Sequence, residues 1–272
     1  MKFLIFIMIF TSCNVLKTLT GGETDPGDDF FPNNNCDPSN TSNGGFCPGN
    51  DNNVYSLSNN LISFWRFDES GGAENRSDNF GNNHLLVTGS ISFDSGVIGN
   101  ALQSSGFDSG NYVNIGSPSG FNFGTGTDFS IAFWIKRNTQ SGFLNYIFDK
   151  MGATDEIQVS IPASSTNINI SIDGFFLDLN GVLTSLSTWY HIVFLVDRDA
   201  GITGYVNGNL FSSNTAITTG VNINNNVLHI GTFNGLGSTD NFAGSIDSMG
   251  VWSHLLNDDE INGLYHGNNI LD

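Results

Sequence analysis

The chain has 272 residues and a formal net charge of −18, from 26 acidic and 8 basic side chains. Such a surface repels phosphate backbones and anionic bilayers, so it excludes nucleic acid as an expected partner and disfavours electrostatic docking to a membrane. Charged residues make up only 12% of the chain, while glycine (33) and phenylalanine (23) are abundant. Because long helices prefer Ala, Leu, Glu, Lys and Arg, this composition predicts strands joined by turns.

The first residues have the pattern of an export signal. Lys2 precedes an apolar run that ends at Phe10, which is too short to span a bilayer but suits the apolar region of a signal peptide. Small residues ending in Cys13 follow at once and resemble the lipobox of bacterial lipoproteins. The resemblance implies a signal peptide over residues 1–12 and lipidation of the Cys13 thiol. The alternative is a signal that is cleaved nearby without lipidation.

Residues 13–60 are predicted to form a flexible stalk rich in Asn, Gly and Asp. The segment has no hydrophobic periodicity and so cannot support a core. Its two further cysteines, Cys36 and Cys47, lie close together, and an exported protein can keep a disulfide between them. A lipidated Cys13 and this disulfide would leave no thiol unused.

Residues 61–272 are predicted to form one β-sandwich domain. The clearest alternation runs through Asp128–Arg137, where Phe129, Ile131, Phe133 and Ile135 share one face. Apolar residues occupy both faces of Trp189–Asp197, as in a central strand. Within Gly204–Phe211, the pair Asn207-Gly208 predicts a type I′ hairpin turn. Only Asn257–Tyr265 has the features of a helix, beginning with acidic residues.

The order of these segments resembles that of laminin-G-like, concanavalin A-like jelly-roll domains. The resembling motifs are Phe64-Trp65-Arg66-Phe67-Asp68, Asp78-Asn79-Phe80-Gly81-Asn82, Phe129–Lys136, Trp189–Phe194, Gly204–Gly208, Leu228–Gly231 and Phe242–Asp247. The stretch 143–186 matches only in length and strand character. The resemblance implies an all-β sandwich of two antiparallel sheets with a short C-terminal helix, a structural calcium ion, and binding of glycans or proteins.

The expected calcium site consists of Asp68, Asp78, Asn82 and Asp247. If the first and last strands pair antiparallel, Asp68 at the end of one lies near Asp247 at the start of the other. Asp78 and Asn82 supply short oxygen ligands on the next loop. The alternative is that Asp68, Asp78 and Asn82 cap turns through hydrogen bonds to the backbone.

The aromatic residues do not define a ligand site. All four tryptophans, Trp65, Trp134, Trp189 and Trp252, fall on core positions of the family pattern, so each is interpreted as a core residue. Aromatic contacts to a glycan would have to come from Tyr146, Phe175, Phe176, Phe211 or Phe233, and ordinary packing is the simpler explanation for each.

No motif for catalysis is found. The glucanases of this fold carry Glu-x-Asp-x-x-Glu on one strand, and that spacing does not occur here. The sequence therefore predicts a non-enzymatic lipoprotein at the bacterial outer membrane or cell surface, anchored only by its lipid and binding a glycan or a surface protein. Two alternatives are a structural subunit of a surface appendage without a small ligand and a divergent polysaccharide hydrolase. The oligomeric state is not predicted.

Overall fold

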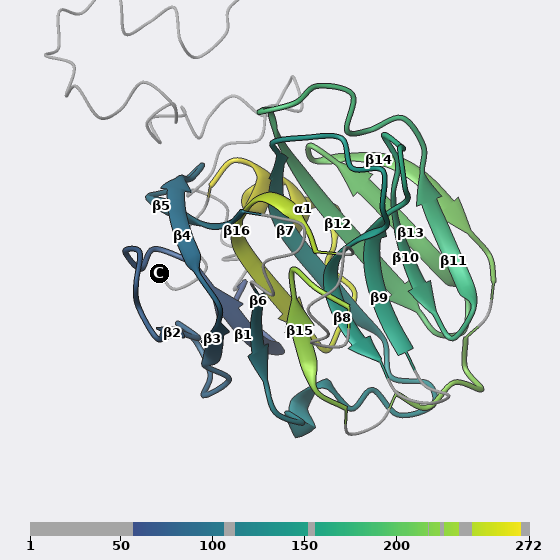
Figure 1. Cartoon of the computed structure of the whole chain (residues 1–272). Helices are drawn as coiled ribbons and strands as arrows, with labels where there is room; N and C mark the ends of the chain where they lie inside the picture. Colours follow the sequence, from purple (N-terminus) through teal and green to yellow (C-terminus); the bar gives the residue numbers. More distant parts are fainter. Residues whose placement is uncertain are drawn as a thin grey trace, which may run out of the picture.

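The computed structural model describes residues 57–105, 112–151, 156–216, 218–223, 226–233 and 241–267. The signal peptide, most of the stalk, Cys13, Cys36 and Cys47 lie outside these residues. In the part of the chain that is described, strands form two antiparallel sheets stacked as layers, with one short α-helix near the C-terminus (Figure 1). This arrangement confirms the predicted fold class.

The first sheet is built around the long strands β7, β12 and β16, which have apolar side chains on both faces. In spatial order its strands are β14 (Asn209–Asn214), β13 (Gly201–Val206), β12 (Trp189–Asp197), β7 (Phe129–Arg137), β16 (Ala243–Trp252), β5 (Asn100–Ser105) and β4 (Ile91–Ser95), with β1 (Leu61–Trp65) paired to β16. The turn between β13 and β14 has φ values of 50° at Asn207 and 76° at Gly208, so both residues are left-handed, as a type I′ turn requires.

The second sheet includes the strands of residues 143–186, the stretch that matches the family pattern only in length and strand character. In spatial order its strands are β11 (Phe175–Leu179), β10 (Ile168–Ile172), β9 (Glu156–Ile161), β8 (Asn145–Met151), β15 (Leu228–Ile230), β6 (Tyr112–Ile115), β3 (Leu85–Thr88) and β2 (Asn75–Arg76). A 3₁₀ helix, η3 (Ser119–Phe121), precedes β7. In Figure 1 this sheet lies in front of the first.

The main core fills the space between the sheets. Phe129, Ile131, Phe133 and Ile135 of β7 are all buried in it, which confirms that they share one face of the strand and shows that this face points inward. From the second sheet, alternate residues of β9 and β10 enter the same core, among them Ile157, Val159, Ile168 and Ile170. The residues between them must therefore point to the outer face of the second sheet.

A second apolar cluster covers the outer face of the first sheet, which we call the covered face. Ala132 and Val193 of that sheet pack against Leu57, Trp252 and α1 (Asp258–Tyr265), which contributes Ile261 and Leu264. Leu57, four residues before the predicted domain boundary at residue 61, is therefore part of the packed domain.

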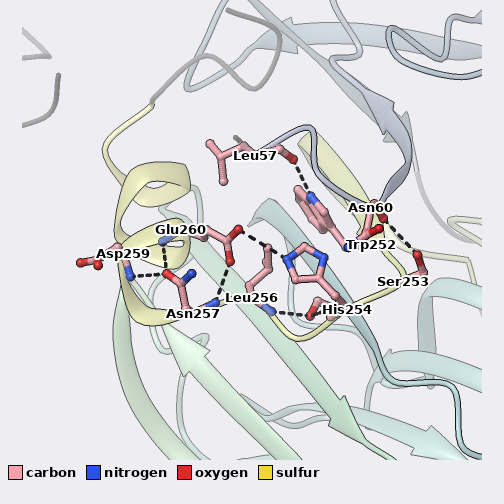
Figure 2. Close-up of polar contacts among 10 residues, drawn as sticks. Leu57, Asn60, Trp252, Ser253, His254, Leu256, Asn257, Asp259 and Glu260 are labelled. Carbon is pink, nitrogen blue, oxygen red and sulfur yellow. Dashed lines mark hydrogen bonds and ion pairs between the residues drawn. The ribbon is translucent and has the colours of Figure 1, made fainter. Parts of the chain in front are cut away.

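Polar contacts fix the helix and the N-terminal segment on the covered face (Figure 2). The Trp252 Nε1–H donates to the Leu57 carbonyl at 2.7 Å, and the Ser253 amide donates to the Asn60 carbonyl at 2.9 Å. Asn257 caps α1, and Glu260 Oε2 accepts from the Asn257 amide at 2.8 Å, which completes a capping box. No helix among the described residues has the length and apolar character needed to cross a membrane.

The tryptophans do not all lie in the core. Trp65 and Trp252 are fully buried, and Trp134 is buried under Tyr265 of α1 with ring centroids 5.6 Å apart. Trp189 is half-buried outside both clusters, and Lys136 Nζ lies 4.7 Å from the centroid of its ring. The interpretation of Trp189 as a core residue was therefore wrong. Trp189 lies on a strand with apolar residues on both faces, so the sequence pattern did not show which of its residues point into the core.

Candidate functional site

The outer face of the second sheet is lined by polar side chains, and we call it the polar face. Strand register places one residue from each of the eight strands side by side across it. This central row consists of Asn75, Leu86, Asn114, His229, Asp149, Gln158, Ser171 and Phe176. At about 4.8 Å between strands, the row is on the order of 30 Å long.

The centre of the row is shielded from solvent, and its ends are exposed. Asp149 is 0% exposed, His229 7% and Gln158 9%, whereas Leu86 and Phe176 at or near the ends are 57% and 55% exposed. Polar groups withdrawn from water need hydrogen-bond partners, because each unsatisfied group costs about 1–3 kcal/mol. The polar side chains in the middle of the row are buried, so their hydrogen-bond partners decide whether their role is purely structural.

Asp149 is the centre of this site. Its Oδ1 accepts a hydrogen bond from Gln158 Nε2 at 2.8 Å, and its Oδ2 lies 4.0 Å from His229 Nδ1. The His229 Nδ1 atom is buried and has no hydrogen-bond partner. Burial lowers the pKa of His229 below its ordinary value of 6.5, so the imidazole is neutral at pH 7.

Aromatic rings border these polar groups. Tyr112 lies edge-on to His229, with ring centroids 5.6 Å apart, and Tyr146 contacts Phe233 at 4.8 Å. A second row beside the central row joins Tyr146 to Ser160, Asn169 and Asp178 in strand register. In that row Ser160 Oγ donates to Asn169 Oδ1 at 2.7 Å, and Asn169 Nδ2 donates to Asp178 Oδ1 at 3.1 Å. Planar polar side chains held in place next to aromatic rings suit a ligand with both hydroxyl groups and apolar faces.

The sequence did not predict these residues as a site. Asp149, Gln158 and His229 come from three strands and are brought together only by register. One signal was present: in β9 and β10 the residues between the core isoleucines and valines are Gln158, Ser160, Asn169 and Ser171, which marks an outer face without an apolar cover.

The structure places the expected calcium ligands in two separate groups. Asp78 closes the loop that follows β2: its Oδ1 accepts from the amides of Phe64, Phe80 and Gly81 at 2.9–3.0 Å, and its Oδ2 accepts from Asn83 at 3.0 Å. These contacts are those of a turn cap, and they leave Asp78 poorly suited to bind a metal. Asn82 is exposed on the same loop.

Asp68, which follows β1, and Asp247, within β16, both accept hydrogen bonds from amides of the segment 97–100. β1 and β16 pair antiparallel, as the calcium prediction required. The Asn100 amide donates to Asp68 Oδ1 at 2.9 Å, and the amides of Val97 and Ile98 donate to Asp247 Oδ2 at 2.7 and 3.1 Å. Burial raises the pKa of Asp247 to about 6; the amide bonds act in the opposite direction, and the charge of Asp68 adds to the rise.

Two carboxylates with oxygens near one loop fit part of a calcium site. Within the described ranges no three His, Cys, Asp or Glu side chains form a metal-binding group. The calcium ion therefore stays a prediction, with Asp68 and Asp247 as the pair that the structure brings together.

A laminin-G-type family profile, described as the concanavalin A-like lectin/glucanases superfamily, matches residues 107–262. The chain belongs to this superfamily, which confirms the resemblance found in the sequence. No curated protein sequence is significantly similar to the chain.

Similar solved structures include toxin binding domains and one domain of a glycoside hydrolase. The binding domain of Paraclostridial mosquitocidal protein 1 has a TM-score of 0.59 and 19% identity, over 77% of this chain and 52% of that chain. The binding domain of botulinum neurotoxin DC, in complex with rat synaptotagmin II, has a TM-score of 0.60 and 17% identity, over 77% and 52%. Domain 4 of AbnA, an extracellular GH43 arabinanase from Geobacillus stearothermophilus in complex with arabinotriose, has a TM-score of 0.58 and 19% identity, over 75% and 98%.

This chain thus spans about half the length of the toxin binding domains that it matches. At such identities the likeness shows the fold alone. The fold is that of the concanavalin A-like lectins and glucanases.

Proposed function

We propose that the protein is an exported cell-surface lipoprotein whose laminin-G-like head binds a glycan through the polar face. The observation that carries this proposal is the centre of the central row, where buried Asp149 is hydrogen-bonded to Gln158 and faces an imidazole nitrogen without a partner. Buried polar atoms without a partner are uncommon in native proteins, so this nitrogen is a candidate contact for a ligand. The complex of AbnA domain 4 with arabinotriose supports a glycan as the class of ligand.

The chemistry of the row suits sugars better than a flat protein surface. Sugar hydroxyls both donate and accept, and the site offers the Asp149 carboxylate with an amide on one neighbouring strand and an imidazole on the other. Tyr112 and Tyr146 provide rings beside these groups. The length of the row, on the order of 30 Å, would allow a chain of sugars to lie across the strands.

The N-terminal region supplies the proposed location. Residues 1–12 would be the signal peptide, Cys13 the lipid anchor and residues 13–60 the stalk, with a Cys36–Cys47 disulfide inside it. The location would be the bacterial outer membrane or cell surface. Metabolic labelling with a fatty-acid probe should mark the protein and fail to mark Cys13→Ser. Equal labelling of both chains would contradict lipidation at this residue.

We propose a head without catalytic activity. The sequence contains no Glu-x-Asp-x-x-Glu spacing, and two of the similar structures described above are binding domains. Incubation with polysaccharides that the protein binds should release no soluble sugar. Turnover that disappears in Asp149→Asn would instead establish a hydrolase.

The direct test of the proposal is binding of the full chain carrying Cys13→Ser to a glycan array, followed by calorimetry on each hit. Gln158→Ala and Tyr146→Ala should each weaken binding roughly tenfold or more, because each removes a contact from the polar face. Leu210→Ala is the matched control, since Leu210 is 65% exposed on the edge strand of the other sheet. An array without hits, or hits that resist the two polar-face substitutions, would contradict the proposal.

A protein partner is the second candidate, and a different surface favours it. Edge strands β11 and β14 meet where Asn214 Nδ2 donates to the Phe176 carbonyl at 2.7 Å. Exposed apolar side chains gather on these two strands: Phe175, Phe176, Leu210 and Phe211. Strand β14 contains no charged residue and no proline, and exposed edge strands of this kind are surfaces for pairing with another chain. If Leu210→Ala and Phe211→Ser abolish oligomers or capture of an envelope protein while glycan binding is absent, the assembly role replaces the glycan-binding one.

A further inference from the structure

The end of the polar face at β11 is open to solvent. Phe176 of the central row is 55% exposed, and Asn169 and Asp178 of the neighbouring row are half-buried. These side chains come from β10 and β11, and β11 is the last strand of the second sheet in the described part of the chain. A ligand can therefore contact them without any rearrangement of the sheet.

Phe176 does not contribute to either apolar cluster. It is paired in register with Ser171, so its side chain belongs to the polar face, and both the main core and the cluster on the covered face lack it. An aromatic ring left in water forgoes the free energy that burial against a partner would provide. Packing within the domain does not account for a phenylalanine at this position.

The polar groups beside Phe176 are hydrogen-bonded in one direction. Ser160 Oγ donates to Asn169 Oδ1 at 2.7 Å, and Asn169 Nδ2 donates to Asp178 Oδ1 at 3.1 Å. The series ends at a carboxylate, which only accepts hydrogen bonds when it is ionised. Asp178 Oδ2 accepts no hydrogen bond from the described residues. This oxygen is the acceptor that remains for a hydroxyl group of a ligand.

The ring and the acceptor have a spacing that suits one sugar unit. Phe176 and Asp178 are two residues apart on one strand, so their side chains leave the same face of the sheet about 7 Å apart. A pyranose or furanose carries C–H groups on its faces and hydroxyl groups at its rim. A sugar ring stacked on Phe176 would therefore bring a rim hydroxyl close to Asp178.

Contacts inside the domain hold β11 in place. Asn214 Nδ2 of β14 donates to the Phe176 carbonyl at 2.7 Å. Leu177 and Leu179, which alternate with Phe176 and Asp178 along the strand, are buried in the main core. A site whose backbone is already fixed loses less conformational freedom when it binds a ligand. This end of the polar face is accordingly both accessible and preorganised.

We infer that the β11 end of the polar face is a subsite for one sugar unit, in which Phe176 stacks on the sugar ring and Asp178 accepts a hydrogen bond from a ring hydroxyl. This inference rests on the proposed function. It goes further by assigning the principal contacts to the exposed end of the two rows, on the edge strand.

Calorimetry on the full chain carrying Cys13→Ser tests the stacking contact. The probes are arabinotriose, maltotriose and the trimer of N-acetylglucosamine, together with every hit from the glycan array. For a probe that binds, Phe176→Ala should weaken binding about tenfold, and Phe176→Tyr should keep the affinity within about twofold. Leu86→Ala is the matched control, because Leu86 is 57% exposed in the central row near its other end. It should leave the affinity unchanged.

A second pair of variants tests the acceptor. Asp178→Asn keeps an oxygen that can accept from Asn169 but removes the charge, so it should weaken binding about tenfold. Asp173→Asn is the matched control: it removes the same charge on an exposed turn, where φ is 47° and asparagine is well tolerated. This control should leave the affinity unchanged.

The outcomes separate the subsite from the proposed function. If none of the three probes nor any array glycan binds, the proposed function fails and the subsite with it. If Gln158→Ala and Tyr146→Ala weaken binding while Phe176→Ala and Asp178→Asn do not, glycan binding stands and the subsite is wrong. Equal losses from Leu86→Ala and Phe176→Ala would also overturn it. Because Phe176 is exposed, Phe176→Ala should leave the Tm unchanged, which separates a lost contact from a lost fold.

Discussion

The two sheets of this sandwich expose outer faces of opposite character. The covered face packs Ala132 and Val193 under Trp252 and α1, and its polar contacts close a capping box and a link to Leu57. The polar face carries Asp149, Gln158 and His229, and the α-helix of the described residues packs against the other sheet. In both sheets, residues along a strand alternate between the core and an outer face. The fold therefore does not determine whether that outer face is apolar or polar.

The difference shows where stability and recognition are separated in the molecule. Burial of apolar surface on the covered face stabilises the folded state, because this surface is removed from water. Polar side chains on the polar face add little to stability, and burying the carboxylate of Asp149 and the imidazole of His229 costs free energy. Substitutions on the two faces should therefore have different consequences, and the predictions below follow from this contrast.

The largest effect is expected on the covered face. Trp252→Ala removes a fully buried ring and its hydrogen bond to Leu57, and it should lower the free energy of unfolding by about 3–5 kcal/mol. Chemical denaturation of the full chain measures this loss. Trp252→Phe is the control: it keeps most of the apolar surface and should lose much less. A loss below about 1 kcal/mol for Trp252→Ala would show that the covered face is not a stability element.

Acid sensitivity should also originate on the covered face. Burial lowers the pKa of His191 to about 3, and its ring packs against Trp134 at 5.0 Å. A histidine whose folded pKa lies below its unfolded value stabilises the fold at high pH, and this contribution is lost as pH falls below 6.5. Between pH 7 and pH 5 the loss from His191 should be about 2 kcal/mol.

Denaturation of the protein and of His191→Phe at both pH values tests this prediction. The variant should be less sensitive to acid than the protein itself. An identical change in stability in the two chains would contradict the assignment to His191.

Asp247 should have the opposite pH dependence. Its pKa is raised to about 6, so the stability linked to its protonated form is present at low pH and lost as pH rises through about 6. In the absence of calcium, Asp247→Asn should therefore raise stability at pH 7.5 by about 1 kcal/mol, since the asparagine oxygen can still accept from Val97 and Ile98.

Calcium separates the two interpretations of Asp247. If Asp68 and Asp247 bind the ion, calcium should raise the Tm of the protein, and chelator should reverse the rise. Asp247→Asn should abolish this response. A Tm that calcium leaves unchanged would reduce both carboxylates to caps of the loop that contains Val97 and Ile98.

The smallest effect on stability is expected on the polar face. Ser171 is half-exposed in the central row, and its hydroxyl donates to Glu156 at 3.3 Å. Ser171→Ala should change the free energy of unfolding by no more than about 0.5 kcal/mol, as measured by chemical denaturation. A loss comparable to that of Trp252→Ala would remove the contrast between the two faces.

Much of the fold could be predicted from the sequence because local signals are strong where strands cross the centre of a sandwich. Alternation in β7 showed which side chains enter the core, and Asn207-Gly208 placed a hairpin turn where the structure has one. The acidic start of the C-terminal helix was also correct, with Asn257 as its cap. These features depend only on neighbours along the chain.

The candidate site could not be predicted in the same way. Asp149 and His229 are far apart in sequence and meet only because β8 and β15 are hydrogen-bonded in one register. A shift of one residue would have turned either side chain into the core. The contacts of Asp78 could not be predicted either: its oxygens accept from backbone amides of its own loop and of β1, and this is a property of loop geometry that spacing does not reveal.

The position of Leu57 has a consequence for how the head would be presented. The chain enters the domain on the covered face, where the Leu57 carbonyl accepts from Trp252. The polar face lies on the opposite side of the sandwich. If the proposed stalk holds the head by its N-terminal side, the polar face would point away from the stalk. A long glycan could then lie across all eight strands without contacting the point where the stalk joins the domain.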